Sequence, residues 1–259
     1  RHRHMCIRYR YKLGNTRGLA INSSYIIDIV DHYYSKIYLY RTNCGLLGQM
    51  GNEGDQPGQF ANPEGIALDL HDNIYITDNN NHSVQKLTQT GEFLTIWGSK
   101  ISSLGEFNRQ SGLEVDNDGF ILIADSENDR IQRFTPYGSF IESWGDSSQF
   151  HNPMDLAIDE SGFIYVADLD VGCVQKLDSF GETIETWDLG STSLPISVAI
   201  NRDLQRIYVS ENGNSKIVVY DYRGNYQFEW GSIGNGNSQF NNLQGIAIDS
   251  IGNVYAADT

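Results

Sequence analysis

The sequence predicts one all-β domain that is built from six copies of a four-stranded unit. Three observations support this prediction: an internal repeat with a period of 42 to 48 residues, four short alternating segments in each copy, and turn residues between the segments. Units of this length with four strands each are typical of the blades of a β-propeller, whose radial closure removes exposed sheet edges. We therefore expect a six-bladed β-propeller with four antiparallel strands per blade.

The repeat is defined by anchor residues that keep a fixed spacing. Its copies start at Gly18, Gly65, Gly112, Asp155, Ser197 and Gly245. Thirteen residues after each start stands Asp31, Asp78, Asp125, Asp168, Ser210 or Asp258. A later aliphatic residue is followed, again after thirteen residues, by Met50, Trp97, Trp144, Trp187 or Trp230. Such regular spacing within one chain indicates repeated structural units.

The strands of each copy are predicted in order from their residue types. The first strand is apolar and small, as in residues 65–68, which suits the crowded position next to a propeller axis. The second is mostly apolar, as in residues 121–124, 164–167 and 207–209, because both of its faces meet neighbouring blades. The third and fourth strands, such as residues 131–134 and 140–144, alternate between apolar and polar residues, which predicts one partly solvated face.

Closure of the ring depends on the two ends of the chain, because the sixth copy contains only its first two strands before Thr259. Residues 5–11 alternate like a strand and precede the first copy. We expect them to complete the last blade as its N-terminal closing strand, in the outermost position. The third strand of that blade is then missing. We therefore interpret residues 1–259 as a single propeller domain that is a fragment of a longer protein.

Composition limits the possible functions. The formal net charge is −15, and residues 1–41 hold eight Lys and Arg against two Asp and Glu, which leaves ten against thirty-one in the remainder. Such an acidic body repels phosphate and argues against a nucleic-acid partner. No apolar run is long enough to span a membrane or to serve as a signal peptide. Three widely separated cysteines predict no disulfide framework, and the compartment stays open.

The motifs resemble the NHL repeat. The resemblance rests on the pattern Gly-x-Phe-x-x-Pro-x-Gly-Ile-Ala-x-Asp and on residues 125–134, Asp-Ser-Glu-Asn-Asp-Arg-Ile-Gln-Arg-Phe, and it covers nearly the whole chain. Repeats departing from the pattern carry Met50, Gln110, Ser197 and Ser210 at anchor positions. The family resemblance implies a six-bladed propeller. It also implies three functions: protein interaction, as in ubiquitin ligases and bacterial receptor kinases, RNA recognition, or lyase activity.

Candidate binding residues lie in the loops after the second and fourth strands, which emerge on one face. Recognition usually occurs on variable loops that a rigid scaffold holds. The set that we single out is polar, rich in Asn and mixed in charge: Asn79, Asn81, His82, Arg109, Glu127, Asn128, Arg130, His151, Asn152, Asp170, Asn214 and Gln244. Turn formation is an alternative role for these Asn residues, because Asn bonds readily to nearby backbone.

The repeated Asp and Trp residues are interpreted as structural anchors, because an active site needs particular residues once. Asp31, Asp78, Asp125, Asp168 and Asp258 would accept backbone N–H bonds and hold the following loop. Trp97, Trp144, Trp187 and Trp230 would pack between blades. We identify no catalytic residue, no metal ligand set and no cofactor motif, and the isolated histidines have no partner at triad or metal-ligand spacing.

The function that we predict is a non-catalytic scaffold. We expect a monomeric propeller that binds a protein or peptide, or a glycan, through this loop face. Two alternatives stay open. One is a metal-dependent lyase or lactone hydrolase with its site at the central channel. The other is an RNA-binding NHL domain, for which few face-borne cations, such as Arg109 and Arg130, are available.

Overall fold

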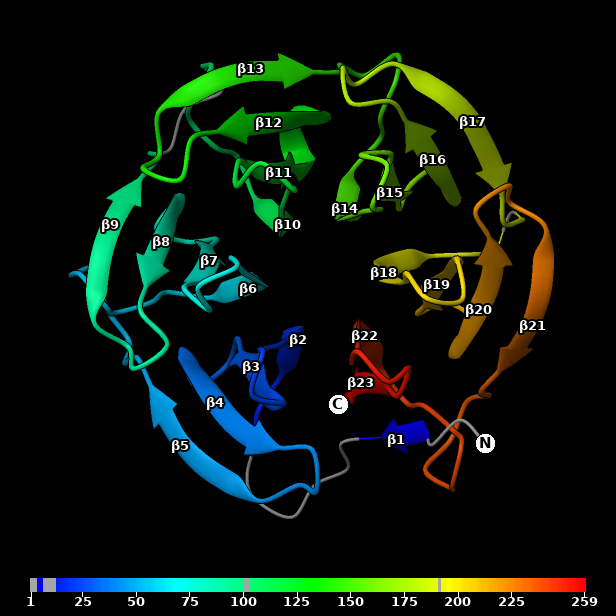
Figure 1. The fold of residues 1–259 in the computed structure, drawn as a ribbon, viewed down its shortest axis with the longest axis horizontal. Helices are drawn as coiled ribbons and strands as arrows, with labels where there is room; N and C mark the ends of the chain where they lie inside the picture. Colours follow the sequence, from blue (N-terminus) through cyan, green and yellow to red (C-terminus); the bar gives the residue numbers. More distant parts are fainter. Residues whose placement is uncertain (1–3, 7–12, 100–102, 191) are drawn as a thin grey trace.

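The computed structural model describes residues 4–6, 13–99, 103–190 and 192–259, and its sheets form a ring around a central axis (Figure 1). Five sheets have four antiparallel strands each, hydrogen-bonded in sequence order. We call them blades 1 to 5. Blade 1 contains β2 (Thr16–Ile21), β3 (Ile26–Asp31), β4 (Lys36–Arg41) and β5 (Leu46–Met50), and blade 2 contains β6 (Pro63–Leu68), β7 (Ile74–Asp78), β8 (Ser83–Leu87) and β9 (Phe93–Trp97).

The next three blades follow the same plan. Blade 3 contains β10 (Gln110–Val115), β11 (Ile121–Asp125), a 3-10 turn η1 (Ser126–Asn128), β12 (Arg130–Phe134) and β13 (Phe140–Trp144). Blade 4 contains β14 (Pro153–Ile158), β15 (Ile164–Asp168), β16 (Cys173–Leu177) and β17 (Thr183–Asp188). Blade 5 contains β18 (Pro195–Asn201), β19 (Arg206–Glu211), β20 (Lys216–Asp221) and β21 (Tyr226–Trp230). The predicted all-β propeller with four-stranded antiparallel blades is confirmed.

The remaining sheet differs from the prediction. It has three strands in the order β1 (His4–Cys6), β23 (Val254–Asp258) and β22 (Leu243–Ile248), so the described residues form five complete blades rather than six. The N-terminal strand pairs directly with β23 and runs parallel to it, with Met5 opposite Tyr255. We had expected it in the outermost position of an antiparallel blade. No hairpin joins β1 to β23, so nothing in the connection imposes the antiparallel direction. Residues 7–11 of the predicted strand lie outside the described part.

The hydrophobic core lies between neighbouring blades. One cluster joins Leu122 and Ile131 of blade 3 to Leu156 and Val166 of blade 4, and all four side chains are buried. Similar clusters join the other neighbours around the ring. Because each sheet buries both faces of its inner strands, the second strands are apolar almost throughout, as in β11 and β15.

The predicted Trp anchors connect the outer strands of adjacent blades. Trp144 of blade 3 lies where a Cβ atom on Gly181, in the last turn of blade 4, would collide with its ring. Trp97 and Gly138 have the same relation, as do Trp187 and Gly224. Each of these glycines has a positive φ, so the turn conformation and the close ring contact both favour glycine. Met50 takes the Trp position in blade 1 and contacts Gly91 in the same way.

Candidate functional site

The innermost strands of the ring enclose a central channel with a cavity of about 620 Å³. Six strands line it: β2, β6, β10, β14, β18 and β22, which meet around the axis in Figure 1. A cavity of this size falls within the range of small-molecule sites in proteins. The channel is therefore large enough to hold a small ligand.

Small residues on these strands allow the close approach of neighbouring blades. A Cβ atom on Gly65 would collide with the backbone oxygen of Ser111 on the next blade, and one on Gly245 would collide with the backbone oxygen of Arg17. Two residues further along the strand, most repeats carry Ala, such as Ala67. This spacing explains the Gly-x-Ala pattern of the repeat.

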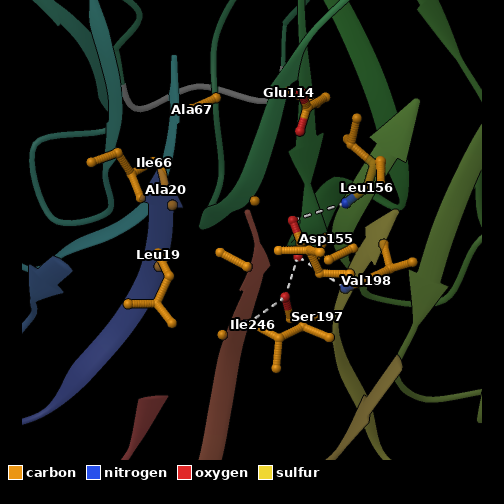
Figure 2. Close-up of a pocket in the computed structure, with 18 of the residues that line it drawn as sticks. Leu19, Ala20, Ile66, Ala67, Glu114, Asp155, Leu156, Ser197, Val198 and Ile246 are labelled. Carbon is orange, nitrogen blue, oxygen red and sulfur yellow. Dashed lines mark hydrogen bonds between the residues drawn. The ribbon is translucent and has the colours of Figure 1, made fainter. Parts of the chain in front are cut away.

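Three adjacent blades depart from this pattern and bring polar side chains into the channel. Blade 3 has Glu114 at the Ala position, and blades 4 and 5 have Asp155 and Ser197 at the Gly position. Figure 2 shows Glu114 and Asp155 on one side of the pocket, with Leu19 and Ala20 on the other. We call the wall that carries these polar groups, from blades 3 to 5, the acidic half, and the facing wall with Leu19, Ala20 and Ile66 the apolar half. The sheets of the apolar half also line the channel with polar residues outside this stretch: Arg17, Glu64 and Gln244 just before the repeat starts, and Asp249 just after β22.

Asp155 is held by a hydrogen-bond network at the blade interface. Its carboxylate accepts bonds from Ser197 Oγ at 2.6 Å, from the Val198 backbone N–H at 3.1 Å and from the Leu156 backbone N–H at 3.0 Å (Figure 2). Ser197 Oγ in turn accepts a bond from the Ile246 backbone N–H at 3.3 Å. Burial raises the pKa of Asp155 to about 6, and these hydrogen bonds oppose the shift without cancelling it.

Glu114 lies two residues further along its strand than Asp155 does, toward the turns that join first and second strands. Its carboxylate accepts a bond from the Val115 backbone N–H. Burial, and then repulsion by Asp155, raise the pKa of Glu114 to about 7, while Arg202 lowers it. Arg202 reaches the same region and donates a bond to the Ile158 backbone oxygen at 3.2 Å. Two carboxyl groups with pKa values near neutrality thus share one wall of the channel.

A second polar cluster lies at the other end of the channel, around Glu64. Its carboxylate is 3.7 Å from Arg17 Nη1 and 3.5 Å from His32 Nδ1, and it accepts a 3.4 Å bond from Asn79 Nδ2. Burial would raise the pKa of Glu64, but the bond to His32 and the Arg17 charge outweigh it and lower the pKa. Arg17 also donates to Gln244 Oε1 at 2.7 Å. The structure therefore brings the predicted residues Asn79 and Gln244 together at this mouth.

The predicted loop residues lie in segments that are joined by backbone hydrogen bonds in each blade. The loop after the second strand donates to the segment that enters the same blade, as in Asn79 N–H to Asn62 O at 3.2 Å and Leu169 N–H to Asn152 O at 3.2 Å. These two kinds of segment thus gather at the same end of every blade. We call this end the loop face, and the opposite end, with the turns between first and second and between third and fourth strands, the turn face.

Several predicted binding residues are used to shape the loops themselves. Asn81 Nδ2 donates to Asp78 Oδ2 at 2.7 Å, Asn128 Nδ2 to Asp125 Oδ2 at 2.8 Å, and Asn214 Nδ2 to Glu211 Oε2 at 2.8 Å. Arg130 is buried and bonds Asp125 through Nε at 2.8 Å and two backbone oxygens through Nη2. The guanidinium of Arg130 is therefore occupied within the fold.

The other predicted residues differ in exposure. Arg109 and Glu127 are about half exposed and lie 3.6 Å apart through Nη1 and Oε1. His151 and Asp170 are exposed, and Asn152 Nδ2 is 3.5 Å from Asp170 Oδ1. His82 is partly buried in a left-handed turn with φ 48°. Among these, the Arg109–Glu127 pair, His151 and Asp170 present charged or titratable groups to solvent.

The repeated Asp residues bond the entering segment as well as their own loop. Asp78 accepts the Ala61 N–H at 2.9 Å, Asp125 the Asn108 N–H at 2.8 Å and Asp258 the Asn241 N–H at 2.6 Å. Asp31 and Asp168 have the same kind of partner, seventeen residues earlier in sequence. Burial outweighs these bonds and raises the pKa of Asp78 and Asp168 to about 6.

Sequence reasoning missed the channel carboxylates and two exposed aromatic residues. Glu114 and Asp155 carry a readable signal, because each replaces a small residue that the other repeats keep at the same position. Tyr33 and Tyr34 lie on the loop face, 71% and 40% exposed, with ring centroids 5.0 Å apart in an edge-on arrangement. Their signal is weaker, since nothing in the sequence separates an exposed from a packed Tyr in a loop.

Within residues 4–6, 13–99, 103–190 and 192–259, no three His, Cys, Asp or Glu side chains form a group that could hold a metal ion. In that same part of the chain, no helix has the length and apolar character to cross a membrane.

Residues 60–87, which span β6 to β8 of blade 2, match the family described as NHL repeat. The ring of four-stranded blades agrees with that match. The chain is a β-propeller that contains an NHL repeat. A search of curated proteins gives no match to the propeller.

Solved structures with a similar fold come from functionally different proteins. A streptogramin B lyase is 18% identical, with 93% of this chain and 75% of that chain covered and a TM-score of 0.69. Kuenenia stuttgartiensis hydrazine synthase is 15% identical, with 96% and 75% covered and a TM-score of 0.71. The nidogen/laminin complex is 15% identical, with 93% and 84% covered and a TM-score of 0.70. At these identities the likeness shows the fold alone.

Proposed function

We propose that this NHL propeller is a binding scaffold that recognises a protein or peptide through its loop face. The observation that carries the proposal is the exposed pair Tyr33 and Tyr34, whose own loop is fixed by their backbone N–H bonds to Asp31. Other loops on the same face are also fixed by internal hydrogen bonds. Rigid aromatic side chains with a polar tip supply much of the binding energy in protein interfaces. The half-exposed Arg109–Glu127 pair, with His151 and Asp170, supplies the polar part of the surface.

Nucleic acid is the less favoured partner for this face. RNA recognition depends on cations that can reach phosphates. Arg130 is buried and bonded to Asp125, and Arg109 lies beside Glu127. The net charge of −15 adds a field that repels phosphate.

The loop-face proposal is tested by affinity purification with crosslinking, which compares three proteins side by side. The wild type should retain a defined partner, and the Tyr33→Ser, Tyr34→Ser double variant should lose it. Tyr137→Ser is the matched control, because Tyr137 is 82% exposed but lies in a turn between third and fourth strands, on the turn face. Loss of the partner in the control, or its retention in the double variant, contradicts the proposal.

A second candidate function is a lyase or lactone hydrolase with its site in the channel. The observation that favours it is the pair Glu114 and Asp155, because carboxyl groups with pKa values near 6 to 7 can donate or accept protons at neutral pH. The streptogramin B lyase shares the fold. Elemental analysis after extensive dialysis tests the metal-dependent form: a stoichiometric metal supports it, and a folded, metal-free protein contradicts it.

We also propose that the ring is six-fold and monomeric, with the sheet of β22, β23 and β1 in the sixth blade position. Strand β22 contacts β2 on one side and β18 on the other, which closes the circle of innermost strands. Its Gly245 meets the Arg17 backbone as the other repeat-start glycines meet their neighbours. Light scattering coupled to size exclusion should give a mass near 29.1 kDa, and a dimer mass would contradict the monomer.

A further inference from the structure

The channel has features that the loop-face proposal does not use. In the acidic half, Glu114 and Asp155 face apolar residues of β2, β6 and β22 across the channel (Figure 2). The apolar half contains Leu19, Ala20 and Ile66. A cavity of about 620 Å³ with one charged wall and one apolar wall is suited to a small ligand that has a charged group at one end and an apolar body at the other.

The two carboxylates keep capacity for further hydrogen bonds. A carboxylate has about four acceptor positions. Asp155 uses three of them, for Ser197 Oγ and for the Val198 and Leu156 N–H groups. Glu114 accepts one bond, from the Val115 N–H. The carboxylate oxygens of Glu114 and Asp155 can therefore accept further hydrogen bonds, and a matching ligand group is a hydrogen-bond donor.

The charge of the channel wall indicates the sign of the charge that a bound ligand should carry. Five carboxylates and two guanidinium groups line the cavity, so it keeps an excess of negative charge when the carboxylates are ionised: Glu64, Glu114, Asp155, Asp203 and Asp249 against Arg17 and Arg202. The net charge of −15 acts in the same direction. A carboxylate or phosphate ligand would add repulsion, whereas an ammonium group would supply both the positive charge and the donors.

We propose that the central channel binds a small organic amine, with its ammonium group at Glu114 and Asp155 and its apolar body against the wall of Leu19, Ala20 and Ile66. Asp155 is positioned for this role by Ser197, whose hydroxyl donates to it across the blade interface. Gly112 leaves the space that the Asp155 carboxylate occupies, because a Cβ atom there would collide with Asp155 Oδ1. This inference is independent of the loop-face function, since the two sites share none of these residues.

The proposal is tested by isothermal titration of the whole chain at pH 8 with phenethylamine as the probe. Phenylethanol is the neutral probe of similar shape, and phenylacetate is the anionic one. We expect saturable one-to-one binding of the amine. Its affinity should be at least about tenfold above that of the alcohol, because the ammonium group adds charge-assisted hydrogen bonds to the carboxylates. No saturable amine binding, or equal affinity for alcohol and amine, would overturn the proposal.

Variants locate the binding in the channel. Glu114→Ala introduces the residue that the other repeats carry, and it should weaken phenethylamine binding by about tenfold or more. Asp118→Asn is the matched control, because it removes one negative charge from an exposed turn of the same blade that does not line the cavity. It should leave the affinity unchanged. Arg202→Gln should strengthen binding, since it removes the opposing positive charge. Equal losses in Glu114→Ala and Asp118→Asn would show a nonspecific charge effect and overturn the proposal.

Discussion

The two halves of the channel wall are built from the same repeat, but they carry different residues at the position where each repeat starts. In the apolar half, Gly18, Gly65 and Gly245 let adjacent backbones approach until no Cβ atom would fit. In the acidic half, Asp155 and Ser197 occupy the corresponding position, and the hydrogen bond between them joins blade 4 to blade 5. The difference indicates that close packing is the default of the repeat, and that blades 3 to 5 exchange part of it for polar groups in a cavity.

Both halves rest on the same outer packing, so the largest expected effect comes from removing it. Trp144→Ala should lower the free energy of unfolding by about 3 to 5 kcal/mol, because it deletes a large side chain that packs on blade 4. Met50→Ala is the matched change in blade 1 and should cost less, since the deleted side chain is smaller and only partly buried. Urea denaturation of both variants measures the difference. A Trp144→Ala cost no greater than that of Met50→Ala would contradict this view of the outer ring.

The apolar half should be the less tolerant of added volume. Gly65→Val should destabilise the propeller by about 1 to 3 kcal/mol, because its Cβ would meet the Ser111 backbone oxygen, which cannot move without displacing a strand. Asp155→Ser, in the acidic half, introduces the residue that blade 5 already carries and should cost less. Thermal unfolding of the two variants sharpens the comparison, and a larger loss for Asp155→Ser would reverse it.

Asp28 in β3 is another departure from the repeat, outside the channel. We expect it to lower the free energy of unfolding. It is 1% exposed, neither carboxylate oxygen has a hydrogen-bond partner, and four other repeats have Tyr at its position. Burial, and then repulsion by Asp72, raise its pKa to about 7. The folded state therefore favours the protonated form of Asp28. The free energy of unfolding should be highest below about pH 4, where Asp28 is protonated in both states, and it should fall as the pH rises through 7.

Replacing Asp28 with Leu, the residue of blade 3, should remove this loss. We expect a gain of about 1 to 3 kcal/mol at pH 8, since an unsatisfied buried polar group is eliminated. The gain should shrink toward pH 4, where Asp28 is protonated. Denaturation curves at the two pH values measure it, and an equal or smaller gain at pH 8 would contradict the assigned pKa.

Much of the fold could be predicted because the same pattern of anchor residues recurs in several copies along the chain. Fixed spacing between Gly65, Asp78 and Trp97, and between their equivalents, sets strand order and blade size before any contact is known. The pairing of β1 with β23 could not be predicted, because its parallel direction depends on where a distant segment meets an open strand edge. Periodicity in residues 5–11 indicates a strand but not its partner.

The candidate sites were harder to predict for a related reason. Residues that recur, such as Asp125, are recognisable as architecture, but surface Asn and Arg residues give no sign of whether they bond within the loop. Arg130 illustrates this, since its guanidinium is buried against Asp125. Glu114 and Asp155 were detectable as single departures from small repeat positions. Their common location became clear only when adjacent blades were placed around one axis.

The most direct test of the central claim, that the acidic half keeps polar groups at a cost to the fold, is the melting temperature of Glu114→Ala without ligand at pH 5 and pH 8. The pKa of Glu114 is raised to about 7, so ionisation disfavours the folded wild type as the pH rises through that value. We predict that the melting temperature of the variant relative to wild type increases from pH 5 to pH 8. A constant difference would show that ionisation of Glu114 does not affect folding, and a decreasing difference would show that its carboxylate stabilises the propeller; either result contradicts the claim.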